Sequence, residues 1–598
     1  MVARRGFILG LIYATLFSIL LLRLLWLQTL SIVDEELAGN LVRRSVEQRR
    51  ESVILDQGRG RILDRNGIIL AGERVHSLLL IPRMPQWHNP SLMKQIATII
   101  GIEHQVLEAQ ARLNDKPFLV YKENQKKPIV LSTEQIEQLA YLQSPAIKVV
   151  PYAQRYQDAP IAAHVIGYLA QNPFLMKQKY SVQMKRGILH ENDLLGVAGI
   201  EKSFDQLLQG VTTSRFTHFV DGQSDAIPGL KDRLITSTNP FYPLNVRTTL
   251  DGKLQNATEE MIDHMHMKDG AIVVLDVENS DIVVMASRPN YDPNSVYPEL
   301  GKWRNRAVLS ETPGSIFKTV VLAAALEDGI VKPGQKFYCS GQWDRYHLRC
   351  WAREGHGVLT LEQAYAQSCN VIIAQIASKL DPGRLEEAAE SLGVLQRIGW
   401  STELLSYPSG SIHSFRQLDG EQEGQLFDRE TARTDPGVLA QTGIGQRDVR
   451  ISPLQAANMV VTLLNAGQLT EPRIVTEISH NNNRSMLRFP HHRVTSYTGK
   501  GGGGVSHSTA QWLLEAMKLT VHSGTASSLL KTPVEVAGKT GTAETGLIED
   551  GKMNQWFIGY TPTHKPKYAF AVMVRNRNAG DSHQALTITD QLLRILDE

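Results

Sequence analysis

Cysteine is scarce in this chain, since only three occur among 598 residues. So few cysteines exclude a small secreted domain held together by several disulfides. An excess of charge of one sign is also missing, because 63 Lys and Arg residues face 61 Asp and Glu residues. The charge balance therefore gives no indication of a nucleic-acid partner, and we expect none. Internal repeats are missing too, which argues against a solenoid.

Long hydrophobic runs are absent except for one near the N-terminus. The apolar stretch from Phe7 to Leu27, interrupted by Arg23, is long enough to span about 30 Å of hydrocarbon as a helix. Arg4 and Arg5 precede it, which favours a cytoplasmic N-terminus. The run exceeds the apolar part of a signal peptide, and no small-x-small cleavage site follows it. We therefore expect a single-pass protein of the inner (cytoplasmic) membrane, with its remaining residues on the outer side.

The chain changes character near residue 242, where polar and helical patterns give way to β-rich ones. Its length suggests about three to four parts. We expect a cytoplasmic tail at 1–5, a transmembrane anchor at 6–30, a juxtamembrane and supporting domain at 31–241, and a larger domain at 242–598.

Local patterns predict particular elements within these parts. The charged, leucine-spaced stretch Ser31–Gln57 is typical of a helix just outside the membrane. Asn66-Gly67 lies between two apolar segments and indicates a β-hairpin with a type I′ turn. A second hairpin is expected where Glu278–Ser280 separates the β-rich runs Ala271–Asp276 and Asp281–Ala286.

The first candidate for chemistry is the pair Ser315 and Lys318, which open an apolar helical run. Positions i and i+3 share one face of a helix, so the serine hydroxyl and the lysine amine can meet. A serine needs an adjacent base to become a nucleophile, and a lysine of lowered pKa can be that base. The Ser-x-x-Lys pattern alone is weak, because it also begins at Ser91 and Ser528.

Two further short motifs carry polar groups. Ser368-Cys369-Asn370 offers a hydroxyl for proton relay and an amide that can hold a peptide group. In Lys539-Thr540-Gly541-Thr542, the lysine and the hydroxyls can bind a carboxylate, and Gly541 permits close backbone approach of a substrate along a strand edge. Each motif alone has a plain structural explanation, and Ser237-Thr238-Asn239 imitates the second.

The order of the three motifs is the strong observation. Ser-x-x-Lys, Ser-x-Asn and Lys-Thr-Gly follow one another in this order in penicillin-binding proteins and serine β-lactamases. The competing matches fail in this respect. Ser237 precedes Ser315, Ser91 lies far from the other motifs, and Ser528 nearly adjoins Lys539.

With these motifs the chain resembles the class B penicillin-binding proteins over nearly its whole length. The segments that extend the resemblance are Arg59–Gly67, Gly196–Glu201, Glu311–Ser315, Gly445-Gln446, Ser452–Gln455 and Trp556–Tyr560. The resemblance implies an α+β protein with a single transmembrane helix, an extended mixed α/β pedestal domain of the dimerisation type, and a transpeptidase domain. In that last domain, helices flank an antiparallel sheet.

The resemblance also implies a serine D,D-transpeptidase that cross-links peptidoglycan stem peptides and is acylated by β-lactams. Ser315 would attack the carbonyl between the two D-alanines of a donor peptide, and Lys318 would take its proton. Ser368 and Lys539 would relay a proton to the departing D-alanine, and Asn370 would hold the substrate backbone.

The same resemblance implies how the developing charges are held. Thr540 and Thr542 would bind the terminal carboxylate, with Lys539 adding positive potential. The backbone N–H groups of Ser315 and Thr542 would form the oxyanion hole. An acceptor amine from a neighbouring strand would then attack the acyl-enzyme, and a β-lactam would trap Ser315 in its place.

All three cysteines lie between the first motif and the end of the second. Cys339, Cys350, His356 and Cys369 together form a usual set of zinc ligands, although the spacing contains no Cys-x-x-Cys. A Cys339–Cys350 disulfide or three plain buried thiols are the alternatives. In the family, some elongation-type members hold zinc beside the active site with Asp, Asp, His and Cys. Cys350, His356 and Cys369 fall at matching spacings, so we favour structural zinc and, with it, a role in elongation and cell shape.

Two other functions compete with the transpeptidase. A β-lactamase is disfavoured by the anchor, the long pedestal and the lack of a Glu-x-x-Leu-Asn segment like that of class A enzymes. A non-enzymatic scaffold or β-lactam sensor must explain why every catalytic position is intact. By resemblance, the expected protein partner is a polytopic glycosyltransferase of the SEDS family, contacted through the anchor and the residues just outside it.

Overall fold

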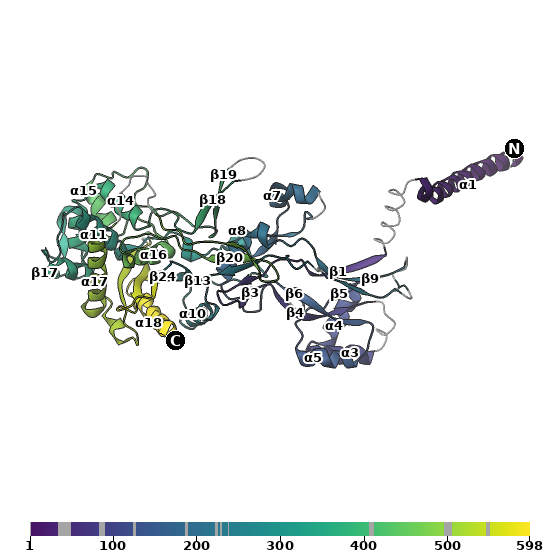
Figure 1. Ribbon diagram of the computed structural model, residues 1–598, viewed down its shortest axis with the longest axis horizontal. Coiled ribbons are helices and arrows are strands. Elements are labelled where there is room, and N and C mark those ends of the chain that lie inside the picture. Colours follow the sequence, from purple (N-terminus) through teal and green to yellow (C-terminus); the bar gives the residue numbers. More distant parts are fainter. Residues whose placement is uncertain are drawn as a thin grey trace. The chain divides into compact units, whose positions relative to one another are not determined.

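The structure is a computed structural model of the chain. It describes residues 2–33, 49–82, 90–123, 127–185, 189–221, 225, 227, 230–236, 239–405, 412–494, 505–545 and 551–597. Two compact units can be distinguished (Figure 1). The first comprises Met1–Gln57, Arg74–Ala153 and Thr212–Thr238, and the second comprises Gly58–Glu73, Gln154–Val211 and Asn239–Glu598. These units are made of separate stretches of the chain, so they do not test the domain boundary expected at residue 242, which stays a prediction.

The N-terminal helix α1 spans Val2–Val33. Within it, Gly6–Trp26 is apolar and exposed, and among the described residues it forms the one helix long and apolar enough to cross a membrane. The expected juxtamembrane helix is wrong for its last part, because Arg50–Asp56 is strand β1. Residues 34–48, which make up most of the expected juxtamembrane helix, lie outside the described part of the chain.

Besides α1, the described residues of the first unit form two small sheets and the helices α3 (Pro90–Ile100), α4 (His104–Leu113) and α5 (Thr133–Tyr141). One sheet has the order β1-β9-β10, with β9 at Ser214–Phe219 and β10 at Arg233–Ile235. The other has the order β5-β4-β6, with strands Phe118–Leu119, Glu73–Leu80 and Ile147–Gln154. The apolar sides of these helices share a core with the second sheet.

In the second unit, short strands form a five-stranded sheet of order β21-β20-β11-β2-β3. Its strands are Ser485–Arg488, Val475–Ser479, Asn245–Thr248, Ile62–Leu63 and Ile69–Ala71. The hairpin expected at Asn66-Gly67 is confirmed, because β2 pairs with β3 on either side of it. The expected type I′ turn is wrong, because Gly67 has a φ of 91° whereas Asn66 does not have a positive φ. Smaller elements nearby are α6 (Ala163–Ile166), β7 (Leu169–Gln171), α7 (Pro173–Lys185), β8 (Leu194–Gly196), α8 (Gly199–Ser203) and α9 (Asp205–Leu208).

A buried ion-pair cluster connects two of the sequence signatures in this unit. Arg59 contacts Glu201 at 2.7 Å and Asp205 at 2.8 Å, and Arg155 contacts the other Glu201 oxygen at 2.5 Å. Tyr180 donates to Asp205 at 2.5 Å. Buried charges of this kind persist only when they are paired, because an unpaired one carries a large desolvation cost. The signatures around Arg59 and Glu201 are therefore explained by packing rather than by chemistry.

A five-stranded antiparallel sheet of order β13-β12-β24-β23-β22 forms the centre of the second unit. Its strands are Ile282–Arg288, Gly270–Asp276, Tyr568–Asn578, Lys552–Thr561 and Ala537–Glu544. The hairpin expected at Glu278–Ser280 is confirmed by the pairing of β12 with β13. Strand β22, which carries the third motif, lies at the edge of the sheet.

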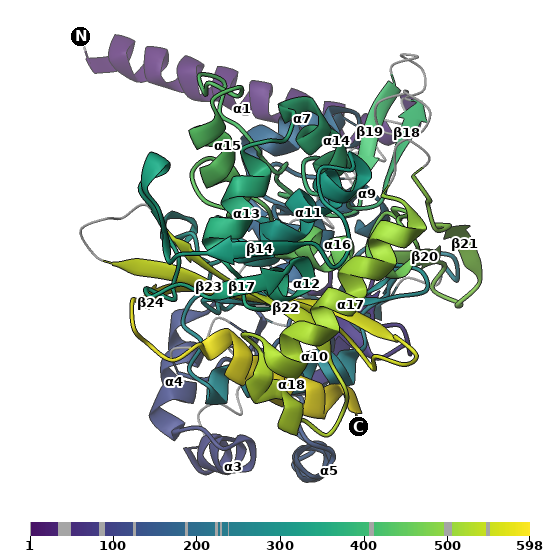
Figure 2. The ribbon, with the colours of Figure 1, turned by 90° about the vertical axis from the view of Figure 1, so that its left-hand side faces the viewer.

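Side chains of this sheet alternate between two hydrophobic cores. Ala271, Val273 and Leu275 of β12 face one core, while Ile272 and Val274 face the other. This period of two is what a strand buried on both faces requires. The first core contains α11 (Lys318–Glu327) and α16 (Pro453–Leu464), and the second contains α10 (Gly252–His264) and α18 (Gln584–Asp597). Figure 2 shows the two helical layers on either side of the sheet, so the expected fold is confirmed.

The remaining helices of this unit are α12 (Leu361–Ala366), α13 (Asn370–Ala377), α14 (Pro382–Ser391), α15 (Pro436–Gly443) and α17 (His507–Ser523). Short strand pairs complete it: β14 (Lys336–Cys339) with β17 (Gly357–Thr360), β15 (Gln342–Trp343) with β16 (Leu348–Arg349), and β18 (Ser401–Leu405) with β19 (Ile412–Arg416).

Candidate active site

The turn that carries Ser315 lies between the backbone of Thr542 and that of Gly445. Residues Gly314–Phe317 form a short 3-10 helix that continues into α11. Gly314 has a φ of +57°, and a Cβ there would lie 2.2 Å from the carbonyl oxygen of Thr542. Its own N–H donates to the carbonyl of Gly445 at 2.9 Å. Only glycine fits this position, because a side chain would meet immovable backbone and favour another φ.

Gly541, on strand β22, allows the strand to approach the Ser315 turn closely. A Cβ on Gly541 would lie 2.8 Å from the carbonyl oxygen of Pro313 and 2.9 Å from a methyl group of Ile316. The close approach that this glycine allows is thus to the turn of Ser315, whereas the sequence suggested an approach to substrate. Strand β22 and the nucleophile turn therefore touch directly.

Lys318 begins helix α11 directly after the Ser315 turn and is completely buried. Its ammonium donates to the Ser368 carbonyl at 2.8 Å, to the Asn370 side-chain oxygen at 2.7 Å and to the Ser368 hydroxyl at 3.3 Å. These acceptors match the three N–H donors of an ammonium group. Burial lowers the pKa of Lys318 to about 8, although negative charge on Cys369 and Cys350 acts in the opposite direction.

The second motif lies on the turn that leads into helix α13. Ser368 has a φ of 53°, which is uncommon for a residue with a side chain. Cys369 is the extended N-cap residue of α13, and Asn370 is its first helical residue. This turn brings the Ser368 carbonyl and the Asn370 amide to one ammonium group. Cys369 is fully buried, as expected.

The side chains of the third motif differ in how far they are exposed to solvent. Lys539 is fully buried, lies 5.6 Å from the centre of the Tyr365 ring, and donates to the Thr540 carbonyl at 2.9 Å. Burial, together with the charge of Lys318, lowers the pKa of Lys539 well below its usual value. Thr542 is exposed, whereas Thr540 is buried. The two threonines therefore differ in their access to a ligand.

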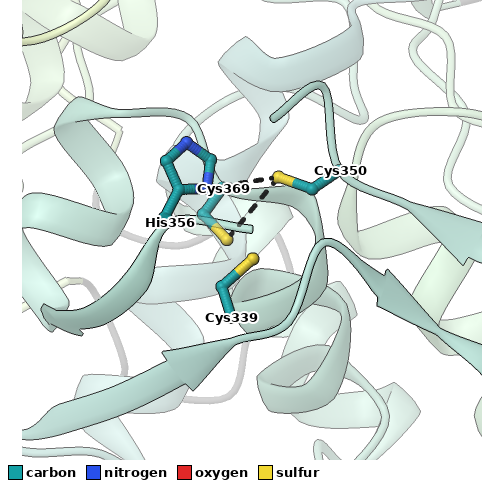
Figure 3. Close-up of side chains that lie close together, drawn as sticks. All are labelled: Cys339, Cys350, His356 and Cys369. Atoms are coloured by element: carbon teal, nitrogen blue, oxygen red, sulfur yellow. Dashed lines mark hydrogen bonds between the residues drawn. The ribbon is translucent and has the colours of Figure 1, made fainter. Parts of the chain in front are cut away.

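The four expected metal ligands converge beneath the second motif (Figure 3). The candidate ligand atoms of Cys339, Cys350, His356 and Cys369 all lie within 4.8 Å of one another. The sulfurs of Cys350 and Cys369 are 3.8 Å apart, and Cys350 Sγ lies 3.4 Å from His356 Nδ1. All three cysteines are buried and free. The hydrogen bond with Cys369 lowers the pKa of Cys350, which favours a thiolate.

Three residues beside these motifs were missed by the sequence reasoning. Tyr365 covers Lys539 with its ring, and the carbonyl of Arg349 accepts from the Asn370 amide at 3.3 Å. The Thr525 hydroxyl lies 2.5 Å from that of Thr540. No local pattern marks them, because each acts through a contact between elements that are distant in the chain.

The family is decided by comparison with known proteins. Residues 270–594 match the penicillin-binding protein transpeptidase domain, and residues 55–225 match the penicillin-binding protein dimerisation domain. The chain belongs to the penicillin-binding proteins. Both domains of a class B penicillin-binding protein are therefore present in the order that the sequence motifs implied.

Curated relatives of this penicillin-binding protein are aligned over most of their length. The stage V sporulation protein D of Bacillus subtilis is 28% identical over 87% of this chain and 74% of its own. The peptidoglycan D,D-transpeptidase MrdA of Haemophilus influenzae is 25% identical over 91% of this chain and 84% of its own.

Solved structures share the fold. One chain of a peptidoglycan synthase complex that coordinates polymerization and crosslinking has a TM-score of 0.65 and 25% identity, covering 99% of this chain and 98% of that one. The penicillin-binding protein PBP2 of Helicobacter pylori, in complex with MreC, has a TM-score of 0.59 and 21% identity. Coverage there is 92% of this chain and 99% of the other.

Replacing Gly314 by alanine in this penicillin-binding protein should disturb the turn of Ser315. The new Cβ would meet the Thr542 carbonyl and strain a left-handed φ, so either the turn or β22 must move. We expect the rate of acylation by a β-lactam to fall by about 10²-fold, since a misplacement near 1 Å has effects of that order. Gly329→Ala, at a positive φ in open space, is the control for backbone strain. Equal rates in both variants would contradict the close contact.

Proposed function

We propose that Ser315 is the nucleophile with which this serine D,D-transpeptidase cross-links peptidoglycan stem peptides during cell-wall synthesis. The observation that carries the proposal is the convergence of all three motifs on one place. Lys318 contacts both polar residues of the second motif, and Gly314 touches the backbone of the third. A serine in a chance Ser-x-x-Lys match on a helix surface would not be expected to lie next to both of the other motifs.

In the proposed reaction, the neutral amine of Lys318 takes the proton as the Ser315 oxygen attacks the carbonyl between the two D-alanines. The pKa of about 8 supports this role, because an appreciable part of the lysine is then unprotonated near neutral pH. Ser368, whose hydroxyl lies 3.3 Å from the Lys318 nitrogen, is placed to pass the proton to the departing D-alanine. The acyl-enzyme on Ser315 then reacts with an amine of a second stem peptide.

The oxyanion of the tetrahedral intermediate is assigned to the backbone N–H groups of Ser315 and Thr542. The contact between Gly314 and the Thr542 carbonyl supports this assignment, because it fixes the spacing of the two backbones before substrate arrives. Donors that need no rearrangement stabilise the transition state most effectively.

The terminal carboxylate of the donor peptide is assigned to Thr542 and Lys539. Thr542 is exposed at the edge of the sheet, where an extended peptide can lie along β22. Within the described part of the chain, the contacts of buried Lys539 include no carboxylate, and its pKa lies well below the usual value. An arriving carboxylate would supply the opposite charge and favour the protonated lysine. A β-lactam presents the same carboxylate and the same reactive carbonyl.

The location and partners follow from the anchor. We propose that Gly6–Trp26 crosses the cytoplasmic membrane with the N-terminus inside, so that the transpeptidase domain acts outside. A glycan-polymerising membrane protein of the SEDS type is the proposed partner. Its support is the similarity to a chain of a complex that coordinates polymerization and crosslinking. Elongation and cell shape are the proposed setting, in line with the MrdA relatives and the ligand cluster.

We further propose that Cys339, Cys350, His356 and Cys369 hold a structural zinc ion. Zinc bound tetrahedrally to sulfur at about 2.3 Å requires sulfurs about 3.8 Å apart. That is the separation of Cys350 and Cys369, and all three cysteines are free thiols. His356 is poised 3.4 Å from the Cys350 sulfur. The bound ion would fix Cys369 and, through it, the positions of Ser368 and Asn370.

Metal analysis tests the zinc site. The purified full-length protein should contain about one zinc per chain, and Cys339→Ser should lower both the zinc content and the melting temperature, because structural zinc contributes folding energy. Three thiols should titrate in denaturant with chelator. A protein without zinc and with a single titratable thiol would instead support the Cys339–Cys350 disulfide.

The experiment that tests the proposed function is labelling of the detergent-solubilised protein with a fluorescent penicillin, followed by intact mass measurement. We expect one stable β-lactam adduct per chain. A folded protein without an adduct would favour a scaffold, and rapid turnover of the drug would favour a hydrolase.

A further inference from the structure

Thr525 lies outside every motif, in the segment that follows helix α17. Its neighbours Ser523 and Gly524 end that helix. The segment Ser523–Thr525 contacts both the loop before the second motif and the strand of the third.

On one side, the segment is bound to the chain just ahead of Ser368. The Thr525 N–H donates to the Ala366 carbonyl at 3.1 Å, and the Gln367 side chain donates to the Ser523 carbonyl at 2.7 Å. Gly524 leaves no room for a side chain, since a Cβ would lie 2.3 Å from the Ala366 oxygen. The segment is therefore held to the residues just before the second motif by one backbone hydrogen bond and one side-chain hydrogen bond.

On the other side, the Thr525 hydroxyl meets the third motif. It lies 2.5 Å from the hydroxyl of Thr540, a residue that is only 6% exposed. Helix α17 packs along β22, so this contact lies in a layer of continuous packing. Thr542, two positions further on the strand, is exposed and remains accessible to substrate.

We infer that Thr525 is a positioning residue of the transpeptidase, which couples the second motif to the third through its hydroxyl bond with Thr540. Thr540 is then a partner of Thr525, and binding of the donor carboxylate belongs to Thr542. The inference rests on the proposed assignment of the three motifs. The sequence motif assigned carboxylate binding to both Thr540 and Thr542, whereas this inference leaves it to Thr542 and gives Thr540 a structural role.

The physical reason is that the two motifs arrive on elements far apart in the chain. Ser368 precedes α13, whereas Lys539 lies on β22, and each must contact the same substrate. Small displacements of catalytic groups reduce rates strongly. A hydroxyl pair supported by a backbone hydrogen bond limits the relative motion of these two elements.

Thr525→Val tests the inference, because valine keeps the shape and removes the hydroxyl. The measurement separates the acylation rate constant of a β-lactam from the dissociation constant of the complex that precedes acylation, using full-length protein in detergent. We expect Thr525→Val to lower the rate constant by about 10-fold with little change in the dissociation constant. Thr525→Ser, which keeps the hydroxyl, should restore the rate. Thr542→Val should instead weaken the dissociation constant, since it loses a carboxylate ligand.

A double variant tests whether Thr525 and Thr540 act as a pair. Thr540→Val should act on the rate constant as Thr525→Val does, and the double variant should be no slower than either single one, because both remove one interaction. Unchanged kinetics in Thr525→Val, or a lower melting temperature alone, would overturn the inference. So would a Thr540→Val variant that weakens the dissociation constant as Thr542→Val does. Failure of the proposed function would be seen separately, as wild-type protein that forms no adduct.

Discussion

Replacing Ser315 by alanine should abolish covalent labelling by a penicillin while leaving the chain folded. The hydroxyl is the atom that forms the acyl bond, and no neighbouring group can replace it in this turn. We expect labelling to fall by at least about 10⁴-fold, in line with the loss of a nucleophile in other serine enzymes. Ser315 is only partly buried and alanine fits the same turn, so the melting temperature should change little. Fluorescent penicillin labelling with intact mass measurement records the result.

Ser528→Ala is the matched control, because Ser528 also begins a Ser-x-x-Lys sequence. Ser528 is exposed on a short 3-10 helix at Ser527–Lys531. Among the described residues it makes no hydrogen bond to a residue of the three motifs. Labelling of this variant should equal that of wild type. A Ser315→Ala protein that still carries one β-lactam would remove Ser315 from the reaction.

Replacing Lys318 by methionine should lower the acylation rate by about 10³-fold, within the range that general acid–base catalysis contributes. Methionine has a similar shape, but it neither accepts the Ser315 proton nor bonds to Ser368 and Asn370. Those two acceptors lose a buried partner, so we also expect a modest loss of stability, of about 1–3 kcal/mol. Circular dichroism should still show a folded protein.

The pH dependence distinguishes a base from a structural lysine. A base must be neutral, and the pKa of Lys318 is lowered by burial to about 8. The acylation rate of wild type should therefore rise with pH and level off above about 8, since the protonated amine dominates below that value. In Lys318→Met this rise should disappear. A wild-type rate that is flat from pH 6 to 9, or a variant with near-normal acylation, would sink the assignment.

Several features of the fold and site could be predicted from local sequence. The hairpin at Asn66-Gly67 follows from the two apolar segments that flank a turn-forming pair, although the type I′ turn itself does not form. The helical run that begins with Ser315 and Lys318 follows from its apolar composition. The apolar run at Gly6–Trp26 likewise predicts a membrane helix from its own composition. Each of these is a property of one short segment.

Other features escaped local reasoning. Arg50–Asp56 has a helix-like pattern but is a strand, because β9 pairs with it along its length. The left-handed φ of Ser368 was not foreseen either, and it turns the Ser368-Cys369-Asn370 segment so that Lys318 can reach both polar residues. Both features depend on partners that are distant in the chain.

By itself, the sequence determined which candidate catalytic groups are present and in which order they follow one another along the chain. Only the tertiary structure decided their working arrangement. It placed Gly541 against the nucleophile turn, buried Thr540 against Thr525, and collected three cysteines and a histidine within 4.8 Å. The physical reason is that spacing within one helix or strand is set by backbone geometry, whereas distances between elements are set by how their side chains pack.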